Sequence, residues 1–485
     1  MKRRSKIFGV IMILFMLVLA GCQNESSSTE AGSGKSGEKE VTIKLFSAHG
    51  QFRNGQYGYE RIQEFMKKHP NIKVEVTYAH GKNWDDTFLA LASSNELPDI
   101  IQPTGNFLIG DLVQNGWVQP LDAHFDIKDR FPNEVFVEGV NMLDGKIYSY
   151  PRISPKSGSF MLYHTDLMEE AGLDPASPPK NWDDLLEMGK QVTEKVDGVY
   201  GFAIPLKDSA AAHTLLLART LQPTLDGEGF DFQKGGYDLD SENVVKAIEF
   251  LLKMKDAGIV HPNSPTLGLL DYQGLFANKQ AAFGFNAQWI VRVNQHELGG
   301  VEDYNVAEIP VLKEGDRLYQ GVVPGTYDAY LTKSTKHPKE AAELLKWLTS
   351  KEDYYVGQMK KDLLLPPHPD LIQDESNYSS EQLKKMAQIL EDTVVYRPVY
   401  ESNLGAFEAK KIEKTMAPPR LQLNDIIIGA YIGEMIDWKK ELTKLNDALN
   451  TRLDEAIKKA AAEGQDVSRD DLTFPNFDGK SNYNQ

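Results

Sequence analysis

Three strand-like segments separated by two amphipathic segments follow residue 40, and this pattern constrains the fold more than any other feature. "VTIKLFS" (41–47) and "IKVEV" (72–76) alternate apolar and polar residues, as half-buried strands do. "LPDIIQP" (97–103) contains a short apolar run. Between them, "YERIQEFMKKHP" (59–70) and "WDDTFLALASS" (84–94) carry apolar residues at helical spacing. This order of elements predicts a parallel sheet with right-handed crossovers, and therefore an α/β fold.

Later segments predict more helices and then a return of strands. Asn181 and Ser241 each precede an amphipathic segment and are expected to cap a helix, and Pro338 is expected in the first turn of another. Strand-like alternation returns in "YNVAEIPVL" (304–312) and "YDAYLTKS" (327–334). The chain is too long for one hydrophobic core, so we expect at least two domains.

The first 21 residues have the pattern of an export signal. Four lysines and arginines between positions 2 and 6 precede an apolar run from position 7 to 20. This run is shorter than the roughly 20 residues of a membrane-spanning helix. It ends in "LAGC", which resembles a bacterial lipobox, and the resemblance implies a lipoprotein signal peptide (1–21) with Cys22 as the lipid attachment point. The alternative is an ordinary signal peptide with a free cysteine, and with a single cysteine no intrachain disulfide can form.

Residues 22–40 predict a flexible tether. Beyond Cys22 they are rich in Ser, Gly and Glu and contain no apolar residue larger than alanine, so they cannot bury enough surface to fold. Glycines at 32, 34 and 37 match a nucleotide-binding pattern, but no strand precedes them and no helix follows. We interpret them as linker.

The acidic balance of the chain argues against nucleic acid as a partner. The formal net charge is −17, and it becomes more negative once the basic signal peptide is removed. Binding to nucleic acid depends on concentrated lysine and arginine. With 41% hydrophobic and 10% aromatic residues, the composition is that of a globular protein.

Several strings, read in order, resemble the family 1 extracellular solute-binding proteins of ABC importers, the group that contains the maltose and oligosaccharide receptors. The strings are "SSNELPDII" (93–101), "GWVQPLD" (116–122), "GKIYSYP" (145–151), "LYHTDLMEEAGLDPASPPKNWDDLLEMGKQV" (162–192), "NKQAAFGFNAQW" (278–289) and "HPKEAAELLKWLTSKE" (337–352). His164 stands where the family commonly has Asn, and the part from about Leu363 matches poorly.

The resemblance implies an α/β, two-lobed, periplasmic-binding-protein-like fold of type II, with lobes joined by crossing hinge strands and a ligand cleft between them. The first lobe is expected in residues 41–152 and 310–350, and the second in 153–309 and 351–485. Ligand would stabilise a closed state of the two lobes.

The resemblance also implies a function. We expect a receptor, not an enzyme, that captures a carbohydrate, in particular an oligosaccharide, and delivers it to ABC transporter permease subunits driven by a separate ATPase. It is expected to be a monomer without cofactor or metal, anchored by Cys22 to the outer face of the cytoplasmic membrane.

Candidate ligand contacts are polar and aromatic residues at strand ends, in loops and near the expected crossings, because flat rings and planar polar groups suit sugars. They are His49, Gln51, Arg53, Asn106, Tyr150, Arg152, Asn286, Gln288, Trp289, Tyr327, Asp328, Tyr396 and Arg397. The first four follow predicted strands, at the end where α/β clefts form. Trp289 lies where similar family members present a stacking tryptophan, the alternative being a buried ring. Trp84, Trp182 and Trp347 are assigned to packing.

Catalytic and metal-binding alternatives find little support in the sequence. The ten histidines are scattered, and "QHELGG" (295–300) lacks the second histidine of a zinc helix. Asp226, Glu228 and Asp231 in "LDGEGFDF" suggest calcium but lack the loop spacing and the terminal Glu, so we interpret them as a turn between strands. A membrane-tethered glycoside hydrolase stays open as an alternative, because 70 acidic residues leave room for a carboxylate pair.

A non-sugar solute on the same fold is a further alternative. The pair Tyr354–Tyr355 suggests ferric ion, but it follows a predicted helix, and we favour packing. A uronic-acid ligand would need cationic partners. Arg53, Arg152 and Arg397 are available, although nothing in the sequence places them together.

Overall fold

The computed structural model describes residues 40–483. The expected signal peptide, the lipid attachment point Cys22 and the tether up to residue 39 lie outside the described residues. Among the residues that are described, no helix combines the length and the apolar character that a membrane span requires.

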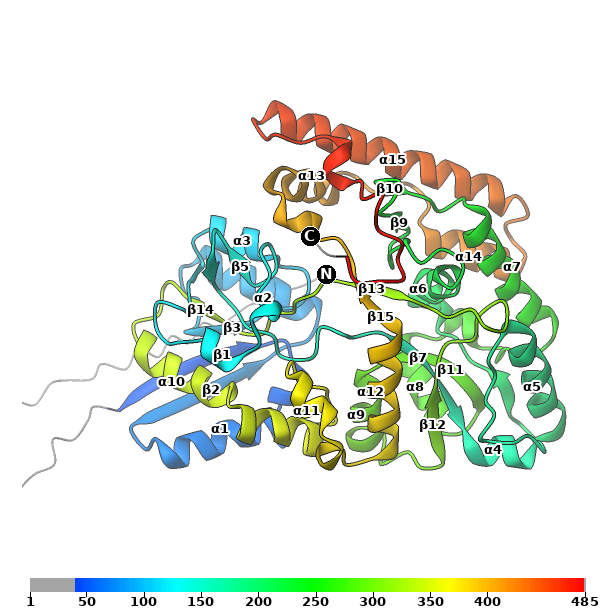
Figure 1. Ribbon diagram of the computed structural model, residues 1–485, viewed down its shortest axis with the longest axis horizontal. Helices are drawn as coiled ribbons and strands as arrows, with labels where there is room; N and C mark the ends of the chain where they lie inside the picture. Colours follow the sequence, from blue (N-terminus) through cyan, green and yellow to red (C-terminus); the bar gives the residue numbers. More distant parts are fainter. Residues whose placement is uncertain (1–39, 484–485) are drawn as a thin grey trace, which may run out of the picture. The chain divides into compact units, whose positions relative to one another are not determined.

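A five-stranded sheet, the first sheet, is built mainly from the beginning of the described chain (Figure 1). Its order is β2-β1-β3-β14-β4, with β1 Val41–Ser47, β2 Ile72–Tyr78, β3 Ile100–Gln102, β4 Val118–Gln119 and β14 Tyr330–Thr332. Strand β1 is parallel to β2 and to β3, which confirms the expected parallel arrangement. Strand β14 comes from far along the chain and is antiparallel to β3 and β4.

Helices cover both faces of the first sheet. They are α1 Tyr57–Lys68, α2 Lys82–Ser93, α3 Ile109–Gln114 and α10 Pro338–Leu348. Ile43 and Leu45 of β1 pack with α1 and α10, whereas Phe46 packs with α2 and α3. The alternation of side chains along β1 therefore supplies two cores.

A four-stranded sheet, the second sheet, has the order β12-β7-β11-β8. Its strands are β7 Ser159–His164, β8 Tyr200–Phe202, β11 Ala281–Ala287 and β12 Tyr304–Ala307. Strand β7 is antiparallel to β11 and β12, and β11 is parallel to β8. The neighbouring helices are α4 Thr165–Glu170, α5 Trp182–Lys195, α6 Leu206–Arg219, α7 Glu242–Asp256, α8 Leu269–Ala277 and α9 Trp289–His296.

Two of these helices begin at the expected caps. The Asn181 side chain accepts a hydrogen bond from the Asp184 N–H, and the Asp184 carboxylate accepts one from the Asn181 N–H. The Ser241 side chain likewise accepts a hydrogen bond from the Val244 N–H. Both predicted caps are confirmed.

The region that matched the family poorly contains α11 Pro369–Gln373, α12 Glu381–Thr393, α13 Leu404–Thr415, α14 Leu423–Ile432 and α15 Trp438–Ala462. Helix α13 packs beside α15 (Figure 1), and both share a core with Phe230 and Phe232. Short helical turns are η1 Gly50–Phe52, η2 Lys128–Arg130, η3 Asn133–Val135, η4 Ser264–Thr266, η5 Lys351–Tyr355, η6 Gln358–Asp362, η7 Glu375–Asn377, η8 Tyr400–Ser402 and η9 Arg469–Leu472.

A small parallel sheet connects segments of the chain that run between the two main sheets. It pairs β13 Gln320–Val322 with β15 Val394–Tyr396. The Gln320 side chain accepts a hydrogen bond from the Ser159 N–H (2.7 Å) and donates one to the Ser159 carbonyl (2.9 Å). Two further strand pairs are β5 Met142–Leu143 with β6 Lys146–Ile147 and β9 Phe230–Asp231 with β10 Gly236–Tyr237.

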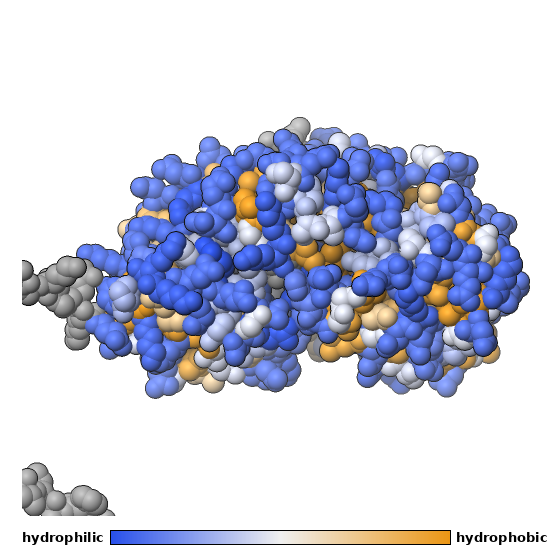
Figure 2. All heavy atoms as spheres, turned by 90° about the horizontal axis from the view of Figure 1, so that it is seen from below, coloured by the Kyte–Doolittle hydropathy of each residue, from blue (hydrophilic) through white to orange (hydrophobic). Residues whose placement is uncertain are grey.

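The three tryptophans assigned to packing lie within the protein. Trp84 is fully buried and stacks on Phe46 at 5.0 Å, and Trp182 stacks on Phe250 at 4.4 Å. The Trp347 ring nitrogen donates to the Arg61 carbonyl. Hydrophilic residues dominate the face drawn in Figure 2, and hydrophobic residues form only small patches on it.

Candidate functional site

A cavity of about 550 Å³ lies at the carboxyl ends of β1 and β3, and we call it the main cavity for this position, although a cavity beside Lys180 and Arg317 is larger, at about 760 Å³. Ligands of α/β sheets bind at this end of the strands, and the volume is within the range of small-molecule sites. The walls come from the ends of β1, β2 and β3, the beginning of α3, the segments that connect the sheets, and η8. The polar side chains among the lining residues are His49, His80, Thr104, Arg152, Thr326, Tyr327 and Glu401.

Asp328 lies beneath this cavity and joins separate parts of the chain. Its side chain is almost fully buried, with 2% of the residue exposed. His49 Nδ1 lies 3.0 Å and Arg152 Nε 3.8 Å from Asp328 Oδ1. Gln102 Nε2 donates to the other carboxylate oxygen at 3.1 Å. The carboxylate therefore orients the histidine and arginine that line the cavity.

Burial sets the protonation of the groups around Asp328. It lowers the pKa of His49, and the positive charge of Arg152 lowers it further, while the contact with Asp328 acts in the opposite direction. The imidazole is then neutral at pH 7, so one ring nitrogen donates and the other accepts. Burial also raises the pKa of Tyr327, so its hydroxyl stays protonated.

Glu401 enters the main cavity from η8. The Arg397 guanidinium holds its carboxylate with two nitrogen atoms, at 2.6 and 3.2 Å, and lies over the Phe232 ring at 5.1 Å. Burial lowers the pKa of Arg397, but the Glu401 carboxylate outweighs it and the net pKa is raised. Gly139 has φ of +79°, and a Cβ there would lie 2.4 Å from the Glu401 carbonyl oxygen. Only glycine lets this loop approach η8 so closely.

The structure brings four of the predicted residues together at the main cavity. His49, Arg152 and Tyr327 line it, and Asp328 lies beneath them. Asn106 lies nearby after β3, exposed, with its side-chain amide donating to Asp85 at 2.8 Å.

Other predicted residues do not line the main cavity, and most of them have structural partners. Gln51 is buried and donates to the Tyr354 hydroxyl at 2.9 Å, and Tyr150 is buried with its ring stacked on Phe131 at 5.8 Å. Arg53 pairs with Glu297 at 2.9 Å. Arg397 is enclosed behind Glu401. Tyr396 lines a separate cavity of about 210 Å³.

The remaining candidates lie together at one end of the second sheet. Trp289 and Asn286 line a small cavity of about 120 Å³ next to the beginning of β7 and the end of β11. The Trp289 ring is half-buried at the beginning of α9. Gln288 is 2% exposed, and among residues 40–483 neither of its amide atoms has a hydrogen-bond partner. A buried amide without partners is costly, so an added polar group would stabilise it.

Sequence reasoning missed four polar residues of the main cavity, namely His80, Thr104, Thr326 and Glu401. His80 follows β2, and the strand-end argument that selected His49 would also have selected it. Glu401 gave no such signal, because it reaches the cavity through a tertiary contact with the loop around Gly139.

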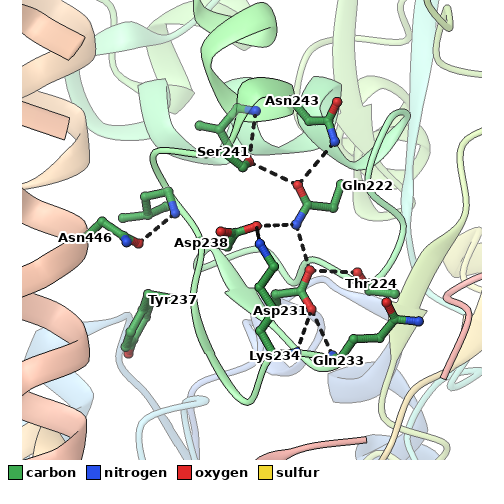
Figure 3. Close-up of polar contacts among 12 residues, drawn as sticks. Gln222, Thr224, Asp231, Gln233, Lys234, Tyr237, Asp238, Ser241, Asn243 and Asn446 are labelled. Atoms are coloured by element: carbon green, nitrogen blue, oxygen red, sulfur yellow. Dashed lines mark hydrogen bonds and ion pairs between the residues drawn. The ribbon is translucent and has the colours of Figure 1, made fainter. Parts of the chain in front are cut away.

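The acidic turn that suggested calcium is held by hydrogen bonds. Figure 3 shows the Asp231 carboxylate accepting from Gln222 and Thr224, and it also accepts from the backbone N–H groups of Gln233 and Lys234. A bridge between Leu225 and Asp231 closes the turn. Within residues 40–483, no group of three or more His, Cys, Asp or Glu side chains is arranged to hold a metal ion.

The tyrosine pair that suggested ferric ion lies in the core. Tyr354 and Tyr355 are 2% and 0% exposed. The Tyr354 hydroxyl accepts from Gln51, and the Tyr355 hydroxyl donates to the Pro151 carbonyl at 2.9 Å. Both rings therefore pack, as favoured from the sequence.

Comparisons with known proteins agree with this architecture. Residues 49–355 match the model of the bacterial extracellular solute-binding protein family. The arabinooligosaccharide-binding protein of Bacillus subtilis (strain 168) is 28% identical over 373 residues, which are 73% of this chain and 78% of that protein.

Solved structures show the same fold. The GacH receptor of Streptomyces glaucescens, solved unliganded and with acarbose, has a TM-score of 0.65 at 17% identity and covers 86% of this chain and 99% of its own. An ABC transporter solute-binding protein of Thermotoga lettingae with bound α-D-tagatose has a TM-score of 0.62 at 18% identity, covering 86% and 100%. The expected two-lobed α/β fold is thereby confirmed.

Proposed function

This chain belongs to the family of bacterial extracellular solute-binding proteins, and we propose that it is a receptor that captures an oligosaccharide and delivers it to an ABC importer. The observation that carries the proposal is the main cavity, where polar groups of separate segments converge at the carboxyl ends of β1 and β3. The name of the relative from Bacillus subtilis supports an oligosaccharide as the cargo.

The polar groups of the main cavity suit sugar hydroxyls, each of which donates one hydrogen bond and accepts others. Arg152 donates, Glu401 accepts, and His49 and Tyr327 can do both. We propose that Trp289 supplies an aromatic surface for a sugar ring, and that Gln288 or Asn286 binds hydroxyl groups beside it.

The finer parts of the proposal rest on the sequence and on the family. We propose that Cys22 carries the lipid anchor at the outer face of the cytoplasmic membrane, and that the receptor is a monomer without catalytic activity. Residues 41–152 and 310–350 would form one lobe and 153–309 and 351–485 the other, closing on the sugar. Permease subunits with a separate ATPase would then accept the cargo.

Thermal unfolding with a panel of oligosaccharides tests this function. The protein without its first 22 residues is refolded to remove carried-over ligand, and each sugar is analysed by chromatography afterwards. A ligand that binds only the folded state at a hundredfold excess over its Kd adds about 2.7 kcal/mol to stability. A raised melting temperature with intact sugar supports the receptor. Shortened sugar would favour the hydrolase, and no shift with any sugar would favour a non-sugar solute.

Variants at Trp289 test the aromatic surface. Trp289→Leu should weaken the binding of the best sugar about tenfold or more, because the flat ring is lost. A tenfold loss of affinity corresponds to about 1.4 kcal/mol of binding free energy. Trp289→Phe keeps a ring and should retain most of the affinity. Equal affinity in Trp289→Leu and the unmodified protein would remove Trp289 from the site.

A further inference from the structure

We infer that the main cavity takes an uncharged oligosaccharide and rejects sugars that carry uronic acids. The inference rests on the proposed function and narrows its class of ligand. It follows from the charges that line the cavity and from the partners that these charges already have.

The arginines that could bind a uronate are already paired with carboxylates. Arg53 Nη2 lies 2.9 Å from Glu297, and Arg397 is bound at 2.6 Å by Glu401. Arg152 is the only arginine or lysine among the described residues that line the main cavity, and Asp328 lies 3.8 Å from it. A uronate would have to compete with a buried carboxylate for its one cationic partner.

The described residues of the wall around η8 offer no free cation. Glu401 is the acidic side chain among the residues of this wall, and two nitrogen atoms of Arg397 hold its carboxylate. An anionic ligand would therefore have to displace Glu401 to reach Arg397.

His49 does not restore a positive charge. His49 is buried, lies between Asp328 and Arg152, and has a lowered pKa, so it is neutral at pH 7. An anionic ligand therefore meets the carboxylate of Glu401 and an arginine that already has a carboxylate partner. A neutral sugar meets the same groups as hydrogen-bond partners.

Matched pairs of sugars test the inference with the mature protein. Each neutral oligosaccharide, for example maltotriose or galactotriose, is compared with the same trimer oxidised to the carboxylate at C6. We expect the neutral member of the best pair to bind at least roughly tenfold more tightly than its oxidised partner. Repulsion between the ligand carboxylate and one protein carboxylate about 10 Å away, at an effective dielectric constant near 20, is large enough to produce this difference. Equal or tighter binding of an oxidised sugar would overturn the inference and leave the receptor function standing. No binding of either class would overturn both.

A charge variant separates electrostatic rejection from shape. Glu401→Gln removes the carboxylate that lines the cavity and leaves Arg397 without its charged partner, so it should narrow the difference within the best pair. The matched control is Glu187→Gln, an exposed carboxylate on α5, which should leave the difference unchanged. A difference that persists unchanged in Glu401→Gln would mean that shape excludes the acid, against the inference.

Discussion

Asp328 shows at the residue scale how one buried carboxylate can organise a site. It contacts a residue after β1, a residue of β3 and a residue of the segment before β7. None of these contacts is local in sequence, so each constrains two segments at once. The position of Arg152 and His49 in the cavity depends on this charge.

Replacing Asp328 should therefore cost stability as well as affinity. Asp328→Asn keeps the volume but leaves the Arg152 charge without its buried partner, and we expect the free energy of unfolding to fall by about 1–3 kcal/mol. Urea denaturation measures the change. Asp129→Asn, at an exposed position, should stay within about 0.5 kcal/mol of the unmodified protein. If both variants have the same stability, Asp328 does not organise the site.

His368 predicts how stability depends on pH. Its ring stacks on Phe131 at 5.4 Å, and burial, with a smaller effect of Lys351, lowers its pKa to about 4. The unfolded chain, with a histidine pKa of about 6.5, binds the proton first as pH falls. Stability is thus fully present above about pH 6.5 and is lost towards pH 4, by at most about 3 kcal/mol from this residue.

The variant His368→Gln isolates this contribution. It should unfold more easily at pH 7 but lose less stability between pH 7 and pH 4, as measured by urea unfolding at both values. His337→Gln, at the N-terminal end of α10, is the matched control and should keep the pH dependence of the unmodified protein. An unchanged pH dependence in His368→Gln would contradict the assignment.

At the element scale, helix caps were predictable because their signals are local. The box formed by Asn181 and Asp184 requires only four consecutive residues. Asn181→Ala should lower the free energy of unfolding by about 1 kcal/mol, because the Asp184 N–H loses its side-chain acceptor. Asn181→Asp keeps an oxygen at the cap and should lose little. Urea denaturation measures the stability of both variants. If Asn181→Ala and Asn181→Asp lose the same stability, the capping oxygen contributes nothing.

The same locality explains which strands could be predicted. Strands β1 and β2 show their alternation within seven residues each, and their parallel pairing follows from the helix between them. The position of β14 between β3 and β4 has no local signal, because more than 200 residues separate it from these strands. The pairing of β13 with β15 also joins segments that are far apart in sequence, so it has no local signal either.

The candidate site also contains residues that local sequence could predict and residues that it could not. His49 was found because it follows a strand that the sequence shows plainly. Gln51, two residues later, was selected by the same argument, but η1 turns its side chain into the core against Tyr354. A strand-end argument selects a loop and cannot tell which side chains of that loop face the cavity.

At the scale of the whole described chain, two contacts connect parts that belong to different sheets. On one side, Arg53 of the first-sheet region pairs with Glu297 after α9. On the other, α13 contacts α3, with Lys411 Nζ 3.1 Å from Asp111 and Gln114 donating to Glu408 at 2.7 Å. The main cavity includes residues from the beginning of α3 and from η8, directly before α13. The distance between its walls therefore depends on the contact of α13 with α3.

Gly110 allows this contact, and replacing it should separate the two helices. A Cβ at Gly110 would lie 2.5 Å from two ring atoms of Phe407, a side chain that is only 5% exposed. Alanine in a helix is normally about 1 kcal/mol more favourable than glycine. A loss of stability in Gly110→Ala would therefore point to this clash. We expect the affinity for the best sugar to fall about tenfold, because α13 can no longer approach α3.

The double variant Gly110→Ala/Phe407→Leu tests the cause. Leucine lacks the two ring atoms that meet the new methyl group, so α13 can return to α3 and the affinity should recover, while Phe407→Leu alone should bind nearly as well as the unmodified protein. Titration calorimetry of the four proteins gives the coupling between the two positions directly. Recovery in the double variant would establish that the approach of α13 to α3 sets the affinity. The walls of the cavity are positioned independently of this contact if Gly110→Ala binds the sugar with normal affinity. The same conclusion follows if adding Phe407→Leu to Gly110→Ala does not restore the affinity.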